Sequence, residues 1–249
     1  GSLLRLLTIM VVNLNNKVGP FWALVITISA GLLIGCVNGG LVGFFGLSAL
    51  IVTLAMLSVI QGLTLVYSGG NNVNILDLDG TWFGFFGRDY MLNVPVPVWI
   101  FLGSAALFWF VLERTTFGRK IFAIGDNEVA SKFCGVNERL IVFMTFVISG
   151  LTTAIAAIIM GSRVMGAQNT IGQGYELTVL AGVILGGTSL TGGQGGIFRT
   201  VIGITMLGFI QNALLLLGYP YYAQWLVTWA VIILVVWLDL AAKRGRVFA

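Results

Sequence analysis

Apolar residues fill the chain in long runs that short polar stretches interrupt. A helix needs about 20 mostly apolar residues to cross a membrane. Eight apolar runs are present, at residues 2–12, 20–38, 47–67, 97–112, 140–160, 178–191, 199–217 and 223–239. The first and the sixth are short for a full crossing, and broken helices occur in membranes where they line a cavity. The pattern predicts an all-α, polytopic membrane protein with about eight membrane segments in this chain.

Composition supports this class and excludes several kinds of chemistry. The chain is 58% hydrophobic and 9% charged, with a mean hydropathy of +1.00, whereas an ordinary soluble domain has roughly 25% charged residues. It has no histidine, which excludes His-based catalysis, His metal ligands and His pH switches. Cys36 and Cys134 are expected as free thiols, because two cysteines so placed make a poor disulfide framework.

The chain begins with "GSLLRLLTIMVV", without an initiator methionine. It shows no short apolar region that ends in a small-residue cleavage site, so no signal peptide is predicted. This start indicates that the natural N-terminus lies further upstream. The alternative, that Gly1 and Ser2 are a cloning remnant, stays open from these residues alone.

Basic residues predict an orientation in the membrane. With alternating crossings, ten of the thirteen Lys and Arg residues fall on one side, in the loop at residues 113–139, near residues 5 and 199, and in the C-terminal tail. Cytoplasmic loops carry the excess of basic residues. The loop and the C-terminus are therefore expected in the cytoplasm. On the other side, the aromatic cluster Trp82, Phe83, Phe85 and Phe86 is expected to form an interfacial belt or a lid.

Glycine is concentrated in two stretches, "GLLIGCVNGGLVGFFG" and "GVILGGTSLTGGQGG". Small residues let helix backbones approach closely in lipid. A phosphate-binding loop is also Gly-rich, but the Lys-Ser/Thr pair that holds phosphates and magnesium does not follow here. The two stretches therefore predict close helix packing and a tight turn rather than nucleotide binding.

Ionisable groups are scarce within membrane depth. This scarcity argues against a proton-coupled carrier, which needs buried Asp, Glu or His relays, and against a membrane hydrolase, which needs a nucleophile with a base or a metal. Amides and hydroxyls that could face a pathway suit a neutral, hydroxyl-rich solute, because they both donate and accept hydrogen bonds. The alternative is hydrogen bonding between helices. The candidates are Asn38, Ser48, Thr53, Gln61, Gln211 and Asn212.

The stretch "AIGDNEVASKFCGV" is a short amphipathic segment between two predicted spans. Asp126 is expected to be its N-cap and Gly135 its stop, with a helix of about eight residues between them. Glu128 and Lys132 are spaced to pair on one face. Val129, Ala130, Phe133 and Cys134 share another face. A helix this short needs support, from the membrane surface or from a groove in a soluble partner; a plain connecting turn is the alternative.

Long stretches of the chain resemble a known family. "GRKIFAIGDNEVASKFCGVNERLI", "YELTVLAGVILGGTSLTGGQGGIFRTVIG" and "GFIQNALLLLGYPYYAQWLV" are similar to permease subunits of bacterial ABC importers for simple sugars, the ribose, xylose, galactose and autoinducer-2 group. The resemblance covers essentially the whole chain. Members have about ten spans of membrane-crossing length, so the resemblance implies that this chain lacks the first two. Gly125-Asp126 stands where the family often has two glycines, which alters the charge there.

The resemblance implies one permease domain over residues 1–249, with a cytoplasmic coupling loop at 113–139. In that family a short coupling helix sits in a groove of a separate ATP-binding subunit. On this chain its residues are Gly125, Asp126, Asn127, Glu128, Val129, Ala130, Lys132, Phe133 and Gly135, within a segment that ends at Val136. The other implied partners are a second permease chain, identical or paralogous, an external sugar-binding protein that is periplasmic or lipid-anchored, and membrane lipid.

The implied function is transport of a monosaccharide or similar small neutral polyol across the bacterial inner membrane. The chain itself is then no enzyme and needs no cofactor or metal, and nucleic acid is not an expected partner. The alternatives are a branched-chain amino-acid permease of the related class and a stand-alone channel or facilitator. The residues do not identify the sugar.

Overall fold

The computed structural model describes residues 1–75, 82–189, 192–220, 226–227, 229–230 and 237. The chain forms two compact units, one of Gly1–Ser104 with Gly135–Gln173 and one of Ala105–Cys134 with Gly174–Ala249. Helices make up both units in the described residues, apart from four strands of two residues each. The predicted all-α class is confirmed.

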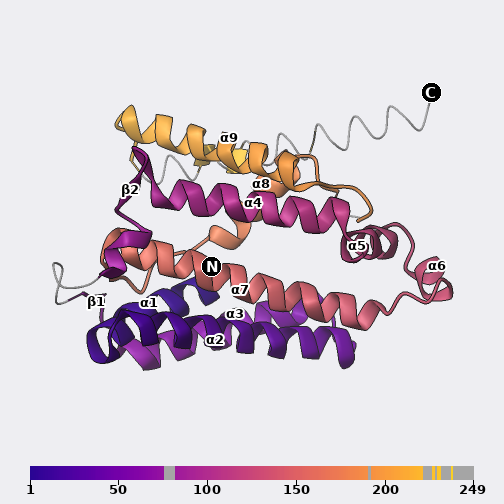
Figure 1. Cartoon of the computed structure of the whole chain (residues 1–249), viewed down its shortest axis with the longest axis horizontal. Coiled ribbons are helices and arrows are strands. Elements are labelled where there is room, and N and C mark those ends of the chain that lie inside the picture. Colours follow the sequence, from indigo (N-terminus) through magenta and orange to yellow (C-terminus); the bar gives the residue numbers. More distant parts are fainter. Residues whose placement is uncertain (76–81, 190–191, 221–225, 228, 231–236, 238–249) are drawn as a thin grey trace. The chain divides into compact units, whose positions relative to one another are not determined.

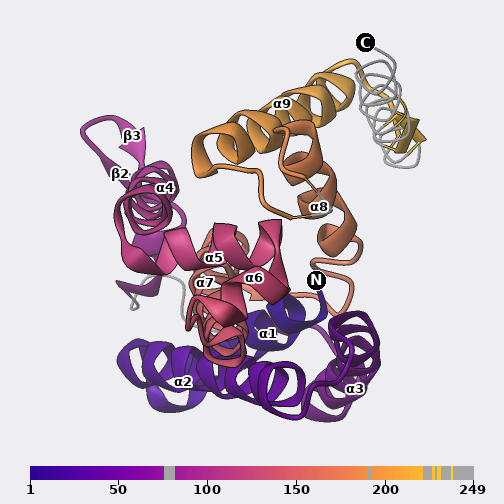
Figure 2. The same ribbon diagram turned by 90° about the vertical axis from the view of Figure 1, so that its right-hand side faces the viewer.

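The first unit is built around a buried helix, α1 (Ser2–Val18). It packs against α2 (Pro20–Gly39), α3 (Ala49–Ser68) and α7 (Glu138–Val164), as Figures 1 and 2 show. Leu7, Ile9, Val11 and Val12 of α1 are completely buried. Because both α2 and α7 cover it, α1 supplies much of this unit's core, in two clusters shared with α7.

Arg5 of α1 belongs to that packing. It is 7% exposed, and its Nε donates a hydrogen bond of 3.2 Å to the carbonyl oxygen of Ile171. The orientation predicted from the basic residues places Arg5 on the cytoplasmic side. Because its guanidinium is buried and donates to a carbonyl oxygen, Arg5 makes an internal contact instead. It therefore does not count toward the orientation in the membrane.

A row of glycines brings α2 against α7. Gly31, Gly35, Gly39 and Gly43 recur every fourth residue and are all buried. A Cβ on Gly35 would lie 2.7 Å from the carbonyl oxygen of Phe146, so the two backbones touch. This confirms the close helix packing expected from the first Gly-rich stretch. The π-helix η1 (Gly40–Phe44) extends α2 and carries the last of these glycines.

Short irregular segments close one end of this unit. Strand β1 (Val73–Asn74) pairs antiparallel with β4 (Gly166–Ala167), and β2 (Tyr90–Met91) pairs antiparallel with β3 (Val94–Pro95). The 3₁₀ helix η2 (Trp82–Phe86) precedes β2. Within η2, Phe83 is fully buried in the core with Val11 and Val12, whereas Trp82 and Phe85 are exposed. The prediction of a belt or lid is therefore wrong for Phe83, which anchors η2 to the helices.

The second unit contains the later part of α4 (Val96–Arg114), then α5 (Thr116–Asp126), α6 (Glu128–Phe133), α8 (Tyr175–Leu185) and α9 (Ile197–Leu216). Helices α8 and α9 form a hairpin (Figure 2). A Cβ on Gly203 of α9 would lie 2.6 Å from the backbone nitrogen of Gly186, at the end of α8. The second Gly-rich stretch thus also serves close packing, as predicted.

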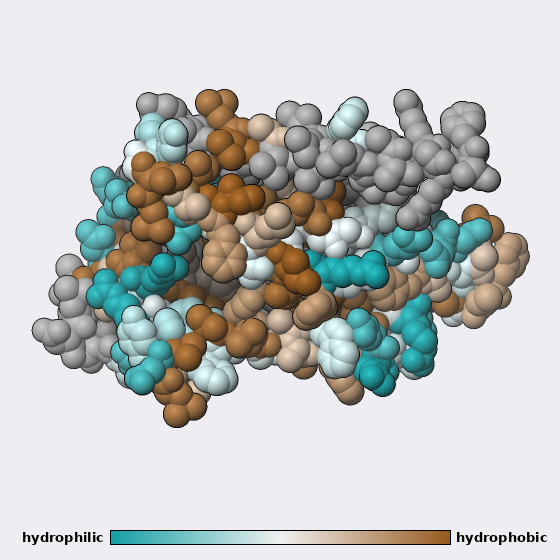
Figure 3. All heavy atoms as spheres, turned by 90° about the horizontal axis from the view of Figure 1, so that it is seen from above, coloured by the Kyte–Doolittle hydropathy of each residue, from teal (hydrophilic) through white to brown (hydrophobic). Residues whose placement is uncertain are grey.

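Within the part of the chain that the structure describes, five helices are long and apolar enough to cross a membrane: Pro20–Phe44, Ala49–Ser68, Val96–Arg114, Glu138–Val164 and Ile197–Leu216. Helix α8 has 11 residues and is too short to cross a bilayer core of about 30 Å at about 1.5 Å per residue. The shortness predicted for the sixth run is thereby confirmed. The eighth run, residues 223–239, falls largely outside the described residues. Apolar side chains lie open on the visible face in Figure 3, as lipid-facing or subunit-facing helices require.

Candidate functional site

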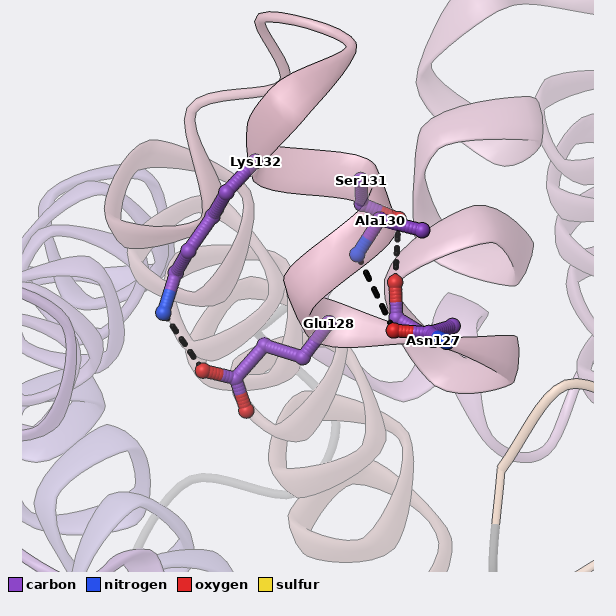
Figure 4. A network of polar contacts seen from close by, with 5 residues as sticks. All are labelled: Asn127, Glu128, Ala130, Ser131 and Lys132. Atoms are coloured by element: carbon purple, nitrogen blue, oxygen red, sulfur yellow. Dashed lines mark hydrogen bonds and ion pairs between the residues drawn. The ribbon is translucent and has the colours of Figure 1, made fainter.

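Helix α6 is a short, well-defined element between α5 and α7. Asn127 caps it: its Oδ1 accepts a hydrogen bond of 3.0 Å from the backbone N–H of Ala130. Ser131 donates from Oγ to the carbonyl oxygen of Asn127 at 2.8 Å. Figure 4 shows both bonds meeting at Asn127 on one flank of the helix. Local side-chain bonds therefore hold this single turn and a half in place.

The other flank carries the predicted ion pair. Lys132 Nζ lies 2.5 Å from Glu128 Oε1 across one helical turn, and both side chains are 55% exposed. Figure 4 shows the two chains reaching toward one another on the side opposite Ser131. An exposed pair of this spacing contributes only about 0.3–0.5 kcal/mol to helix stability. The pair therefore orients the two side chains on the helix surface more than it stabilises the helix.

Two details of the prediction are wrong. Asp126 is not the N-cap, because α5 continues through Asp126 and the chain turns extended at Asn127, whose φ is −157°. The helix has 6 residues rather than about eight. The predicted stop is confirmed: Gly135 follows the helix with φ +75°, a conformation that glycine adopts without steric cost.

The apolar face of α6 points away from the rest of its unit. Phe133 is 88% exposed and Val129 is 62% exposed, and Ala130 and Cys134 are also exposed. Ser131 is 5% exposed and marks the side that packs inward. A phenylalanine with so much open surface on a polar helix is typical of a docking surface.

Sequence reasoning missed α5, the helix that carries α6. Thr115 caps it by accepting a hydrogen bond of 3.4 Å from Gly118 N. Gly118 packs directly on the end of α4, where a Cβ would lie 2.7 Å from Leu112 Cα. Phe117, Ile121 and Ile124, spaced at helical intervals after a threonine, are the signal that predicts such a helix.

The six candidate pathway residues belong to both units, four to the first and two to the second. Asn38 lies on α2 and Gln61 and Thr53 on α3 in the first unit, whereas Gln211 and Asn212 lie on α9 in the second. Ser48 immediately precedes α3, is exposed, and makes no side-chain capping bond.

Three of the six have informative surroundings. Thr53 is exposed, but its hydroxyl donates to the carbonyl oxygens of Ala49 and Leu50 in its own helix, at 2.8 Å and 3.1 Å. The amide oxygen of Asn38 is shielded by the chain and finds no hydrogen-bond partner among the described residues. Helix α3 buries only Val52, Ile60 and Thr64, so Gln61 lies open on its other face. Their role in a pathway stays a prediction.

Other polar residues that sequence reasoning missed are buried or networked. Asn15 and Thr27 are 5% and 0% exposed, and their side chains lack partners among the described residues. Asn169 links the end of α3 to the segment after α7: it accepts from Ser68 Oγ at 3.0 Å, and its Nδ2 donates to the carbonyl oxygen of Asn71 at 3.1 Å. The polar cluster "SGGNNVN" signals this network in retrospect.

Known proteins resemble the chain along most of its length. The family described as "Branched-chain amino acid transport system / permease component" matches residues 3–236. The chain belongs to this permease family. The ribose import permease RbsC of Escherichia coli K12 is 39% identical over 96% of this permease and 75% of its own length. RbsC of Bacillus subtilis 168 is also 39% identical, over 96% and 74% of the two chains.

Relatives with other sugars in their names match as well. The L-arabinose transport permease AraH of E. coli K12 is 37% identical over 84% of this permease and 63% of its own length. The D-allose transport permease AlsC of the same organism is 35% identical over 89% and 68%. No solved structure matches this permease. Family membership and the five apolar helices together make it a multi-pass membrane protein of the inner membrane.

Proposed function

We propose that this chain is the membrane-spanning subunit of an ATP-driven importer for a monosaccharide or similar small neutral polyol. The observation that carries the proposal is the likeness to ribose import permeases over 96% of the chain. Relatives named for arabinose and allose support a sugar of this class. The chain hydrolyses no ATP itself and moves its solute without covalent change.

Three partners follow from this function. A cytoplasmic ATP-binding subunit receives α6 in a groove, a second permease chain completes the path, and a sugar-binding protein delivers solute from outside. The exposed Val129 and Phe133 supply the apolar contact with the ATP-binding subunit. Residues 113–139 and the C-terminus face the cytoplasm, in accordance with the basic residues that remain in the count once Arg5 is removed.

ATP-driven closure of the two ATP-binding subunits moves α6 and reorients the spans to which it is attached. The path is lined by uncharged groups, with Asn38, Gln61 and Asn212 among the residues that contact the solute. Amides of this kind both donate to and accept from sugar hydroxyls. The exposed face of α3 beside Gln61 suits a path completed by the second chain.

Two other functions remain alternatives. The description of the family names branched-chain amino acids, which favours an amino-acid permease as the second candidate. A stand-alone facilitator is the third, and it needs no ATP-binding subunit. An amino acid carries a carboxylate and an ammonium group that call for charged partners, whereas the candidate pathway residues are all uncharged.

Uptake measurements distinguish these functions. The full chain is expressed with its ATP-binding and sugar-binding partners in cells that lack their own sugar importers, and uptake of labelled ribose, arabinose, allose and leucine is recorded. The proposal expects uptake of at least one of the sugars, lost when the Walker lysine of the ATP-binding subunit is substituted. Uptake of leucine alone supports the amino-acid permease. Sugar uptake that persists without ATP hydrolysis supports a facilitator.

A further inference from the structure

The end of α5 touches the turn that leads into α9. The glycine turn, residues 192–196, lies against Gly125 and Asp126, the last two residues of α5. A Cβ on Gly125 would lie 2.5 Å from the backbone nitrogen of Gly193 and 3.3 Å from its Cα. A Cβ on Gly192 would lie 2.7 Å from the carbonyl oxygen of Gly125. Two backbones therefore meet here with no room for a methyl group on either side.

Backbone conformation adds a second requirement for glycine in the turn. Gly192 and Gly193 have φ values of +92° and +74°, in the left-handed region that side chains disfavour. A Cβ on Gly193 would also overlap Oδ1 of Asp126. The obstacle at Gly192 is backbone, whereas the main obstacle at Gly193 is a side chain that can rotate. Substitutions at the two positions should thus differ in severity.

The glycine turn also packs closely against the end of α8 and the start of α9. Within it and the residues before it, Ser189 N–H donates to the carbonyl oxygen of Gln194 at 2.9 Å. A Cβ on Gly195 would lie 2.8 Å from Cγ2 of Thr188. At the base of the hairpin, a Cβ on Gly186 would lie 3.0 Å from Cα of Thr200. Close backbone contacts of this kind run from the end of α5 to the start of α9, all within the second unit.

We propose that the glycine turn positions α6 and passes its movement to the α8–α9 hairpin. Only Asn127 separates Asp126 from α6, so a displacement of α6 acts directly on the contact with the turn. Close-packed contacts without voids transmit displacement with little compliance. The inference rests on the proposed function, in which an ATP-binding subunit moves α6. It assigns to residues 192–193 a positioning role, apart from the face of α6 that binds the partner.

The test compares two pairs of glycines. The members of each pair have the same kind of backbone conformation but differ in their surroundings. Gly192→Ala introduces both positive-φ strain and a backbone clash, whereas Gly187→Ala introduces the same strain, at φ +80°, with nothing within 4 Å of the new Cβ. Gly125→Ala introduces a clash without positive φ, and Gly208→Ala in α9 places its Cβ in open space. Membrane insertion, capture of the ATP-binding subunit and uptake of whichever labelled sugar the wild-type chain accepts are recorded for each variant.

The inference expects Gly192→Ala and Gly125→Ala to insert normally, and it expects Gly192→Ala, which leaves residues 125–136 unchanged, to capture the ATP-binding subunit as the wild type does. Their uptake should fall about tenfold or more, within the usual range of coupling free energies, while Gly187→Ala and Gly208→Ala keep most of theirs. Uptake at the wild-type level in Gly192→Ala and Gly125→Ala, or losses of the same size in Gly187→Ala and Gly208→Ala, overturns the inference. A wild-type chain that captures no ATP-binding subunit overturns the proposed function and this inference together.

A rescue experiment guards against loss of folding. Asp126→Ala removes the carboxylate that opposes a Cβ at position 193 and leaves Asp126 Cα at 3.3 Å. Uptake by the double variant Gly193→Ala/Asp126→Ala should therefore recover to near the level of Asp126→Ala alone. Asp126→Ala should not rescue Gly192→Ala, whose obstacle is the backbone of Gly125. Rescue of both variants, or of neither, would show that the contact between the glycine turn and the end of α5 is not the cause of the lost uptake.

Discussion

Oδ1 of Asn127 accepts a hydrogen bond of 3.0 Å from the backbone N–H of Ala130, and this bond starts α6. An isolated helix of six residues is unstable in water. Its exposed apolar face can be presented to a partner only if the first turn is fixed. The cap at Asn127 therefore bears on function as well as on local structure.

Asn127→Ala removes this cap. The loss should destabilise α6 by about 1 kcal/mol and weaken capture of the ATP-binding subunit by roughly fivefold, since about 1.4 kcal/mol corresponds to tenfold. Asn127→Asp keeps an accepting oxygen and is the matched control, expected to stay near wild type. Titration of the captured subunit against the permease in detergent measures the difference. Equal affinities for the alanine and aspartate variants would contradict the role of the cap.

The sequence predicted Asp126 for this cap, and the reason for the error is physical. Asp and Asn are equally good N-caps, so the choice depends on where α5 ends. Helix α5 continues through Asp126 because Gly125 and Asp126 pack against Gly192 and Gly193, far along the chain. A contact between such distant segments leaves no local signal. The stop at Gly135 needs only a residue that tolerates positive φ, and the sequence predicted it correctly.

Phe83→Ala should destabilise the first unit. The ring is fully buried beside Val11 and Val12, and the carbonyl oxygen of Phe83 accepts a hydrogen bond of 2.6 Å from Ser162 Oγ. Removing a buried phenylalanine ring costs about 3–5 kcal/mol. A thermal unfolding scan of purified permease in detergent should show a clearly lower midpoint for Phe83→Ala. Phe85→Ala is the control: its ring is 45% exposed, and a comparable drop there would count against a special role for Phe83.

When several aromatic residues follow one another, the sequence does not show which of their side chains points inward. The stretch "WFGFF" is apolar on every side, so neither periodicity nor composition singles out Phe83. Its burial depends on its packing against α1 and α7, where Gly161, without a side chain, leaves room for its ring. By contrast, apolar runs of roughly membrane-crossing length predicted the existence of α2, α3, α4, α7 and α9, because length and hydropathy alone decide such helices.

Gly35→Ala should loosen the contact between α2 and α7. The new Cβ would lie 2.7 Å from the carbonyl oxygen of Phe146 and 3.1 Å from Cα of Val147. Overpacking of this kind costs about 1–3 kcal/mol. Gly62→Ala in α3 is the control, since nothing lies within 4 Å of its Cβ and alanine favours a helix over glycine by about 1 kcal/mol. Unfolding midpoints should fall for the first variant and hold or rise for the second; the reverse order would refute the glycine contact.

The row of glycines on one helix face has a signal in the sequence, whereas the residues that would line a pathway have none. A repeat of small residues every fourth position places them on one helix face by geometry alone. Amides and hydroxyls such as Gln61 and Asn212 carry no comparable periodic signal, and the structure divides them between its two units. Which of them face a solute depends on a second chain and on the solute itself, neither of which a single sequence encodes.

Capture of the ATP-binding subunit by tagged permease shows whether the exposed face of α6 binds that subunit. Phe133→Asp places a carboxylate where the side chain is 88% exposed, and Tyr90→Asp does the same on the β2–β3 hairpin, where the side chain is 71% exposed. Burying an unpaired carboxylate in an apolar groove costs several kcal/mol. Phe133→Asp is expected to insert normally but to capture no ATP-binding subunit, whereas Tyr90→Asp should capture it as the wild type does. Normal capture by Phe133→Asp would contradict the account.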